Sequence, residues 1–314
     1  MNLQARKLIC TLFCISITFQ IGLAQQHPAI SRNPSGKVFS FGIVTDIQYA
    51  DAEKKGNRDY RNSLGKLEKC VNEFNEHDLA FVVNLGDLID HDFISYEKPL
   101  AILDKLKAPL FNVIGNHDFE VGDQVKDQVR KQLKNKNGYF KFEVNRLIFI
   151  VLDGSDVSAF AYPKGSERYN SGIAHCEALK GKGSNNAFTW NGGIGAKQLK
   201  WLEKLLNKAD KLHKKAVIFC HWPLLPENGT QLWNNREVLS LINGHPSVAA
   251  WIAGHHHAGG YERAGTVHHM TLKGMVEAGT ETSFGIVEVF HDKLVLKGYG
   301  DQNDQSLETD QPNN

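Results

Sequence analysis

The chain has 314 residues, which is long enough to bury a large hydrophobic core in one large domain or two small ones. Hydrophobic residues make up 41% and charged residues 23% of the chain, an ordinary composition for a soluble globular protein. The 36 Lys and Arg residues balance 35 Asp and Glu residues, so a net charge of +1 gives no general attraction to nucleic acid or to an anionic membrane. Any affinity for phosphate must therefore come from a local site.

Residues 1–24 have the pattern of a secretory signal peptide. A basic Arg-Lys pair at 6–7 precedes an apolar run at 8–19, and small residues at 22 and 24 provide a cleavage site. A membrane anchor is the alternative interpretation, although the apolar run is short for a span of the bilayer. We therefore predict an exported protein, periplasmic or extracellular, that begins near Gln25 and is not inserted in a membrane after cleavage.

Cysteine usage excludes a disulfide scaffold. Cleavage of the signal peptide removes Cys10 and Cys14 and leaves Cys70, Cys176 and Cys220. Three cysteines allow at most one disulfide, and they lack the close pair spacing of a thiolate metal site. Cys220 ends an apolar run, so we expect it to be buried.

Strand and helix patterns alternate after a polar, Pro-containing lead-in at 25–36. Short apolar runs rich in β-branched residues predict buried strands, and apolar residues spaced three or four apart predict helices. Strands that alternate with helices indicate an α/β sheet whose functional loops lie at the carboxyl ends of the strands. In this half we expect strands at 38–45, 79–84 and 110–114 and helices at 60–76 and 95–107.

The pattern continues to residue 300 with one interruption. Residues 154–194 have no periodicity and are rich in Gly, Ser and Asn, so we predict an irregular insertion near the site. Residues 301–314 are polar and are predicted to be a disordered tail, which leaves one domain at 37–300. The remaining expected elements are helices at 121–134, 196–212 and 233–243, a hairpin at 138–144 and 147–152, strands at 216–220 and 248–253, and antiparallel strands at 267–272, 284–290 and 293–297.

Polar side chains follow the predicted strands at the points where the strands end. Any one of them alone is more simply explained as a helix cap or as a hydrogen-bonded core residue. Because the carboxyl ends of the strands in an open α/β sheet converge on one crevice, several together predict a single site. The residues are Asp46, Asp87, Asn116, His221, His255 and His257.

These residue types predict a centre that holds two metal ions. Oxygen and imidazole donors without a thiolate favour Mn²⁺, Fe or Mg²⁺ over a structural zinc ion. Two such ions about 3.5–4 Å apart can share a hydroxide and hold a phosphoryl oxygen, which suits displacement at phosphorus. In an extended segment, His255 and His257 share one face and His256 points away. One ion would bind Asp46, Gln48, Asp87 and His257, and the other Asp87, Asn116, His221 and His255.

Five motifs follow one another along this part of the chain. They are Asp46-Ile47-Gln48, Gly86-Asp87-Leu88-Ile89-Asp90, Gly115-Asn116-His117-Asp118, a lone His221 after a strand, and Gly254-His255-His256-His257. Together they resemble the signature of the calcineurin-like metallophosphoesterases. For residues 37–300 the resemblance implies a four-layer αββα sandwich of two mixed β-sheets flanked by helices, with a dimetal centre at one edge.

The same resemblance implies roles for residues in these motifs. Asp87 would bridge the two ions, and Asn116 would bind the second ion. His117 would steady the phosphoryl oxygens or protonate the leaving group, and Asp118 would orient His117. A hydrogen-bonded loop residue is the alternative interpretation of His117. His256 stands where relatives often have Thr, so no role is transferred to it.

A closer resemblance, over nearly the whole predicted domain, is to the manganese-dependent ADP-ribose/CDP-alcohol diphosphatases. Gln48 stands where most of the superfamily has histidine, and this subfamily shares the glutamine. The resemblance implies hydrolysis of the pyrophosphate bond in nucleoside diphosphate compounds such as ADP-ribose or CDP-choline, through hydroxide attack on phosphorus. The ions would be Mn²⁺, with Fe, Co²⁺ and Mg²⁺ as alternatives. The similar residues are 46–51, 58–64, 254–261 and 267–277.

Four residues that follow the first metal loop are candidates for substrate contacts. An aromatic ring would support a base, and an arginine would bind the distal phosphate through its planar fork of donors. The alternative interpretation is the exposed start of an amphipathic helix. The four residues are Tyr49, Arg58, Tyr60 and Arg61.

Two other functions stay open at this stage. One is a secreted phosphomonoesterase or lipid phosphodiesterase on the same dimetal fold. It stays open because the diphosphatases are best known from the cytosol and act on mainly intracellular substrates, whereas this chain is predicted to be exported. The other is a non-catalytic metal-binding protein on a retired phosphoesterase fold. A retired site is expected to lose ligands, and no ligand position is missing here.

Overall fold

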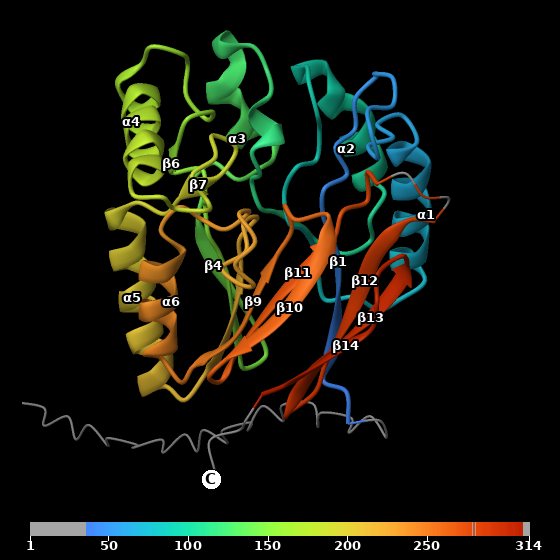
Figure 1. Cartoon of the computed structure of the whole chain (residues 1–314). Helices are drawn as coiled ribbons and strands as arrows, with labels where there is room; N and C mark the ends of the chain where they lie inside the picture. The colour runs from blue at the N-terminus through green and yellow to red at the C-terminus, as the bar shows by residue number, and fades with distance from the viewer. Residues whose placement is uncertain (1–35, 278, 280, 310–314) are drawn as a thin grey trace, which may run out of the picture. The chain divides into compact units, whose positions relative to one another are not determined.

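The computed structural model of the chain describes residues 36–277, 279 and 281–309. These residues form two six-stranded mixed sheets and one two-stranded sheet (Figure 1). The predicted signal peptide, nearly all of the lead-in and residues 310–314 lie outside the described residues.

The first six-stranded sheet has the order β14-β13-β12-β1-β2-β3. Strands β1, β2 and β3 are parallel, and β12, β13 and β14 pair antiparallel with their neighbours. The strands are β1 (Phe39–Val44), β2 (Val82–Asn84), β3 (Leu110–Asn112), β12 (Ser283–Val289), β13 (Lys293–Gly300) and β14 (Gln305–Glu308).

The second six-stranded sheet has the order β10-β11-β9-β8-β5-β4. Its four inner strands are parallel, and the edge strands β4 and β10 pair antiparallel. The parallel pairing of β11 with β9 corrects the prediction of purely antiparallel strands after residue 267. The strands are β4 (Phe140–Val144), β5 (Leu147–Val151), β8 (Lys215–Phe219), β9 (Val248–Ala253), β10 (Ala258–Ala264) and β11 (Val267–Lys273), and the small sheet has β6 (Val157–Ser158) and β7 (Gly192–Gly193).

Apolar side chains from both sheets meet in the space between them. Phe41 of the first sheet and Phe149 of the second lie edge to face with ring centroids 5.5 Å apart. Each also stacks on a neighbouring ring, Phe41 on Phe81 at 4.7 Å and Phe149 on Phe219 at 5.8 Å. All four side chains are at most 1% exposed. Truncating a buried aromatic ring to Ala costs about 3–5 kcal/mol, so the interior between the sheets is a main source of stability.

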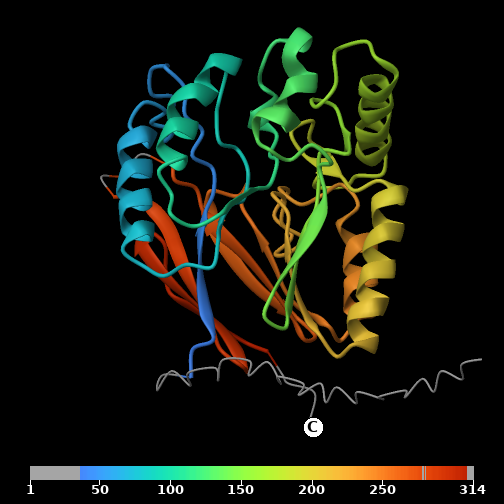
Figure 2. The same cartoon turned by 180° about the vertical axis from the view of Figure 1, so that it is seen from behind.

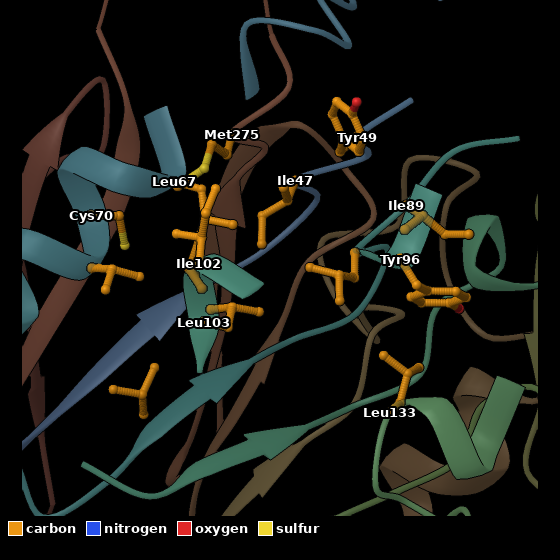
Figure 3. Packing of buried hydrophobic residues seen from close by; sticks show 14 of the residues in the cluster. Ile47, Tyr49, Leu67, Cys70, Ile89, Tyr96, Ile102, Leu103, Leu133 and Met275 are labelled. Atoms are coloured by element: carbon orange, nitrogen blue, oxygen red, sulfur yellow. The ribbon is translucent and has the colours of Figure 1, made fainter. Parts of the chain in front are cut away.

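Helices cover the outer face of each sheet (Figures 1 and 2). On the first sheet, Leu67, Cys70 and Ile102 lie in the buried cluster drawn in Figure 3. On the second sheet, Leu202 and Leu206 are buried against the strands. This arrangement confirms the predicted αββα sandwich. The covering helices are α1 (Ser63–Asn75), α2 (Glu97–Leu103), α5 (Ala196–Lys211) and α6 (Asn235–Asn243).

The segment 154–194 is not the irregular insertion that the sequence predicted. It contains β6, β7 and helix α4 (Glu167–Gly181). The Ser166 hydroxyl caps α4 by accepting a backbone N–H of its first turn at 3.3 Å. Only Gly172 and Cys176 of α4 are buried, so its sequence lacks the apolar periodicity that marks the other helices.

The predicted disordered tail is wrong for the residues of β14. This strand pairs antiparallel with β13, and its Leu307 is buried while Ser306 and Glu308 are exposed. A strand this short, with one apolar side chain, has no repeating pattern to detect. The domain therefore extends beyond residue 300.

Two further elements differ from the prediction. The expected helix at 121–134 is a 3₁₀ helix, η3 (Asp123–Gln128), followed by the short α3 (Val129–Gln132). Strand β10 was not expected because it contains Gly259 and Gly260, and glycine is unfavourable in strands.

The cysteines that remain in the described chain are buried free thiols: Cys70, Cys176 and Cys220. Burial raises the pKa of Cys220 to about 12, so this thiol is unreactive at neutral pH. Across the described ranges, no helix is both long and apolar enough to cross a membrane.

Acid is expected to destabilise the fold through His269 in β11. The side chain is buried, and neither ring nitrogen has a hydrogen-bond partner among the described residues. Burial, together with the neighbouring His268, lowers the pKa of His269 to about 4, against about 6.5 in the unfolded chain. The unfolded state therefore binds more protons below pH 6.5, and stability falls as the pH drops towards 4 by up to about 1.4 kcal/mol per pH unit.

Urea unfolding at pH 7 and pH 4.5 measures this effect. Between pH 7 and pH 4.5 the free energy of unfolding of His269→Leu is expected to fall less than that of the wild-type chain. Leucine cannot bind the proton that His269 takes up on unfolding. His291→Leu, at an exposed histidine, is the control and should keep the wild-type pH dependence. Equal losses in the wild type and in His269→Leu would contradict the assignment.

Candidate metal centre

The carboxyl ends of parallel strands in both sheets bring predicted ligands to one edge of the fold. Asp46 lies two residues after β1, Asp87 three residues after β2, and His221 two residues after β8. His221 Nε2 lies 3.1 Å from Asp87 Oδ2 and 4.0 Å from Asp46 Oδ1. All three residues are fully buried, so strand ends that are far apart in the sequence form one polar cluster.

The first donor group lies around His257. Its Nε2 is 3.2 Å from Asp46 Oδ1 and 3.1 Å from Gln48 Nε2. Gln48 Nε2 is in turn 3.2 Å from Asp87 Oδ2. The structure therefore brings together the four residues predicted to hold one ion.

The second donor group lies around His221. Its Nε2 is 3.1 Å from Asp87 Oδ2 and 3.2 Å from His255 Nδ1, and the donor atoms of these three residues lie within 4.8 Å of one another. Asn116 is buried beside them, since the backbone N–H of the next residue, His117, donates to Asp87 Oδ1 at 2.8 Å. Because Asp87 Oδ2 faces both groups, Asp87 is placed to bridge two ions.

The three histidine rings each turn one nitrogen towards the cluster. His221 Nδ1 donates to a backbone carbonyl at 2.9 Å, and His257 Nδ1 donates to Glu277 Oε1 at 2.5 Å. His255 Nε2 donates to Asn191 Oδ1 at 2.9 Å, because Asn191 uses its Nδ2 to donate to two backbone carbonyls. The opposite nitrogen of each ring faces the polar cluster, as in metal-binding histidines.

Two amide oxygens in this cluster are buried without a hydrogen-bond partner in the described part of the chain. They are Gln48 Oε1 and Asn116 Oδ1, and the equally buried Asp46 Oδ1 faces the His257 and His221 rings. Each unpaired buried oxygen costs about 1–3 kcal/mol, and divalent cations bind carboxylate and amide oxygens. The residues therefore fit two cations. Gln48 presents Nε2 to Asp87 and His257, so coordination by its oxygen requires the amide to turn over.

The carboxylates hold protons on the histidines that face them. Burial alone would lower the pKa of His221, but Asp87 and Asp46 raise it to about 9. Burial would likewise lower the pKa of His257, but Asp46 and Glu277 raise it to about 10. Burial opposes ionisation of both aspartates, yet the histidines lower the pKa of each. The cluster therefore favours positive charge, and binding cations must displace these protons.

Strained backbone is concentrated at the predicted ligands. The φ angles are 51° at Asp46, 44° at Gln48, 54° at Asp87 and 67° at His255, a region that costs a non-glycine residue about 1–3 kcal/mol. They are half of the eight non-glycine residues with positive φ in the described chain. His255 is thus not in the extended conformation that the sequence predicted, although it and His257 both face the cluster.

The carboxylate beside His117 is not the predicted one. His117 Nδ1 lies 3.3 Å from Asp90 Oδ1 and 3.2 Å from Glu120 Oε1. Asp118 instead accepts hydrogen bonds at 2.9–3.0 Å from three backbone N–H groups, in the Asp87 loop and in its own loop. The prediction that Asp118 orients His117 is therefore corrected: Asp90 faces the ring, and Asp118 supports the loop that carries Asp87.

Of the four candidates for substrate contacts, the structure brings only Arg58 against His117. Arg58 Nη1 lies 3.2 Å from His117 Nε2, whereas Tyr60 is 3% exposed and lies in a small buried cluster with Ala50 and Val276. Tyr49 lies in the hydrophobic cluster of Figure 3, and Arg61 lies at the surface, where it binds two carboxylates at 2.5 Å. Arg58 is the candidate that can contact a substrate.

Sequence reasoning missed residues that hold the site side chains in place. Asp90 ends the Gly-Asp-x-x-Asp motif, and this second aspartate was a usable signal. Glu277 and Asn191 had no such signal, because their partners His257 and His255 lie 20 and 64 residues away in the chain.

Replacing Glu277 with Gln is expected to weaken Mn²⁺ binding about 10–100-fold. The Glu277 carboxylate accepts the proton of His257 Nδ1, and removing its charge makes the opposite nitrogen a weaker donor. Calorimetric titration of the folded variant with Mn²⁺ measures the change. Glu203→Gln, on the exposed face of α5, is the matched control. An affinity equal to that of the wild type would exclude this role for Glu277.

Comparison with known proteins agrees with this geometry. The model of the calcineurin-like phosphoesterase family matches residues 39–259. A manganese-dependent ADP-ribose/CDP-alcohol diphosphatase from Xenopus laevis is 31% identical over 93% of this chain and 97% of its own length. The Arabidopsis thaliana protein of the same name is 32% identical over 83% and 94%. The crystal structure of a dimetal phosphatase from Danio rerio superimposes with a TM-score of 0.78 at 26% identity, covering 87% of this chain and 100% of that one. The chain therefore belongs to the calcineurin-like phosphoesterase family and, within it, to the group of the manganese-dependent ADP-ribose/CDP-alcohol diphosphatases.

Proposed function

We propose that this chain is a manganese-dependent dimetal phosphohydrolase. Its substrates are nucleoside diphosphate compounds of the ADP-ribose and CDP-choline type, and the reaction is hydrolysis of their pyrophosphate bond. The observation that carries the proposal is the pair of donor groups that share Asp87 Oδ2. The printed names of the related proteins support the metal and the substrate class.

Hydrolysis adds water across a phosphorus–oxygen bond, so the hydroxyl joins phosphorus and the leaving phosphate takes the proton. When bound, Mn²⁺ ions would supply the positive charge that activates water and stabilises the phosphoryl oxygens. The side chains that would hold them are Asp46, Gln48, Asp87 and His257 for one ion and Asp87, Asn116, His221 and His255 for the other.

In the proposed reaction, His117 donates the proton to the leaving group. Burial alone would lower its pKa, but the charges of Asp87, Asp90 and Glu120 raise it. A raised pKa favours the protonated imidazole that a general acid needs. Asp90 faces Nδ1, and Nε2 lies 3.2 Å from Arg58 Nη1, which can only donate. Nε2 can therefore carry the proton only when the Arg58 guanidinium turns to the phosphate oxygens instead.

A substrate screen with the Mn²⁺-loaded protein tests the proposal. ADP-ribose and CDP-choline are expected to be hydrolysed, with release of AMP and CMP, faster than a simple phosphomonoester or a phospholipid head-group diester. A preference for either of the last two would instead support a phosphomonoesterase or lipid phosphodiesterase. No hydrolysis of any of the four compounds by protein that retains Mn²⁺ would contradict a catalytic function.

We also propose that the chain is exported. The support is the basic pair at 6–7, the apolar run at 8–19 and the small residues at 22 and 24. N-terminal sequencing of the native protein is expected to begin near Gln25, in a fraction outside the cytoplasm. A native protein that starts at Met1 in the cytosolic fraction would contradict export.

A further inference from the structure

Two aromatic side chains stack against each other at the surface of the segment that follows α4. Phe188 is 40% exposed and Trp190 is 49% exposed, and their ring centroids lie 4.5 Å apart with an interplanar angle of 9°. They are two of the three exposed aromatic side chains in the described residues, the third being Tyr261. Phe188 and Trp190, the aromatic pair, therefore present flat apolar surface to solvent.

The backbone under the aromatic pair is held firmly, although the rings are exposed. The indole of Trp233 donates to the carbonyl of Phe188 at 3.0 Å, and the indole of Trp222 donates to the carbonyl of Trp190 at 3.2 Å. On the amino-terminal side, buried Asn186 donates to a backbone carbonyl at 2.7 Å. Such a surface is preorganised, so a ligand that stacks on it loses little free energy to ordering the protein.

The aromatic pair lies directly beside the candidate metal centre. Asn191 follows Trp190 in the chain and accepts a hydrogen bond from His255 Nε2 at 2.9 Å. Trp222, which holds the Trp190 carbonyl, follows His221 and packs with its ring centroid 5.5 Å from that of His255. The residue next to the aromatic pair in the chain, Asn191, therefore contacts a predicted metal-binding histidine.

We propose that the aromatic pair is the surface on which the base of a nucleotide substrate stacks while its phosphates lie at the metal centre. The inference rests on the proposed function, which requires a base near the scissile bond. Stacking on aromatic rings tolerates any base because every base has a π-face. The aromatic pair therefore accounts for one site that accepts both adenine and cytosine nucleotides.

Binding of AMP and of ribose 5-phosphate to the Mn²⁺-loaded protein, measured by calorimetry, tests the inference. The two ligands share the ribose and the phosphate, and only AMP carries a base. In Trp190→Ala, AMP is expected to bind about tenfold more weakly, whereas ribose 5-phosphate keeps its wild-type affinity. Phe188→Ala is expected to act in the same direction, and Trp190→Phe is expected to restore AMP binding.

The control variant is Leu212→Ala, which removes an equally exposed apolar side chain at the end of α5. It should leave the affinity for both ligands unchanged. Unchanged AMP affinity in Trp190→Ala would overturn the inference. Self-association that disappears in Trp190→Ala while AMP affinity stays constant would also overturn it, because the aromatic pair would then be a contact between copies of the chain.

The same measurements separate this inference from the proposed function. If the protein hydrolyses ADP-ribose but the Trp190→Ala variant binds AMP as tightly as the wild type, only the stacking surface is overturned. Base-dependent AMP binding that requires Trp190, in a protein that hydrolyses neither diphosphate, would support the stacking surface and contradict the proposed reaction.

Discussion

Hydrolysis of ADP-ribose by the Asp87→Asn variant is expected to be at least about 10³-fold slower than by the wild type, which corresponds to about 4 kcal/mol. Asp87 Oδ2 lies 3.2 Å from Gln48 Nε2 in one donor group and 3.1 Å from His221 Nε2 in the other. Asparagine keeps the shape of the side chain but lacks the negative charge and one anionic oxygen. It therefore cannot bridge two dications.

Steady-state turnover, metal content and thermal unfolding of the purified variant measure this outcome together. Asp78→Asn, the same substitution at an exposed position, is the control and should retain wild-type turnover. Near-normal turnover of folded Asp87→Asn with unchanged Mn²⁺ content would contradict the dimetal hypothesis.

The Gly115→Ala variant is expected to lose at least about 10²-fold in activity, because a side chain here displaces Asp87. A Cβ atom at position 115 would lie 2.1 Å from Asp87 Oδ1 and 2.7 Å from Asp87 N. The second of these atoms belongs to the backbone, so the loop after β2 has to move. Movement of this loop carries Asp87 out of both donor groups.

Gly65→Ala is the matched control, since a Cβ atom there meets no atom within 4 Å and the position lies inside α1. This control should keep full activity and gain about 0.5–1 kcal/mol of stability, as alanine does over glycine in a helix. Measuring the activity and the Mn²⁺ affinity of both variants tests whether Gly115→Ala displaces Asp87. Wild-type Mn²⁺ affinity in Gly115→Ala would refute the claim that this glycine fixes the position of Asp87.

The sequence by itself determined which residues meet at the metal centre. A buried strand is a continuous apolar run that stops where a polar residue begins, so Asp46, Asp87 and His221 could be placed at strand ends. Parallel strands with crossover connections present their carboxyl ends at one edge, so these residues were expected to converge. The αββα layers followed from the resemblance to a known family.

Local patterns failed where an element buries little of its own surface. Helix α4 buries only Gly172 and Cys176, and β14 contributes the single apolar residue Leu307. Neither segment shows the period of its secondary structure in its sequence. Both elements form because neighbouring structure supplies a partner, such as β13 for β14.

The tertiary structure alone decided which partner each site residue has. The resemblance implied Asp118 as the carboxylate that orients His117, but Asp90 and Glu120 are the carboxylates that lie 3.3 Å and 3.2 Å from His117 Nδ1. Arg58 and Arg61 stand three residues apart, yet Arg58 reaches His117 while Arg61 binds carboxylates at the surface. These outcomes depend on hydrogen bonds and ion pairs between distant segments. The packing of the two sheets sets their geometry, and no local propensity of the chain encodes it.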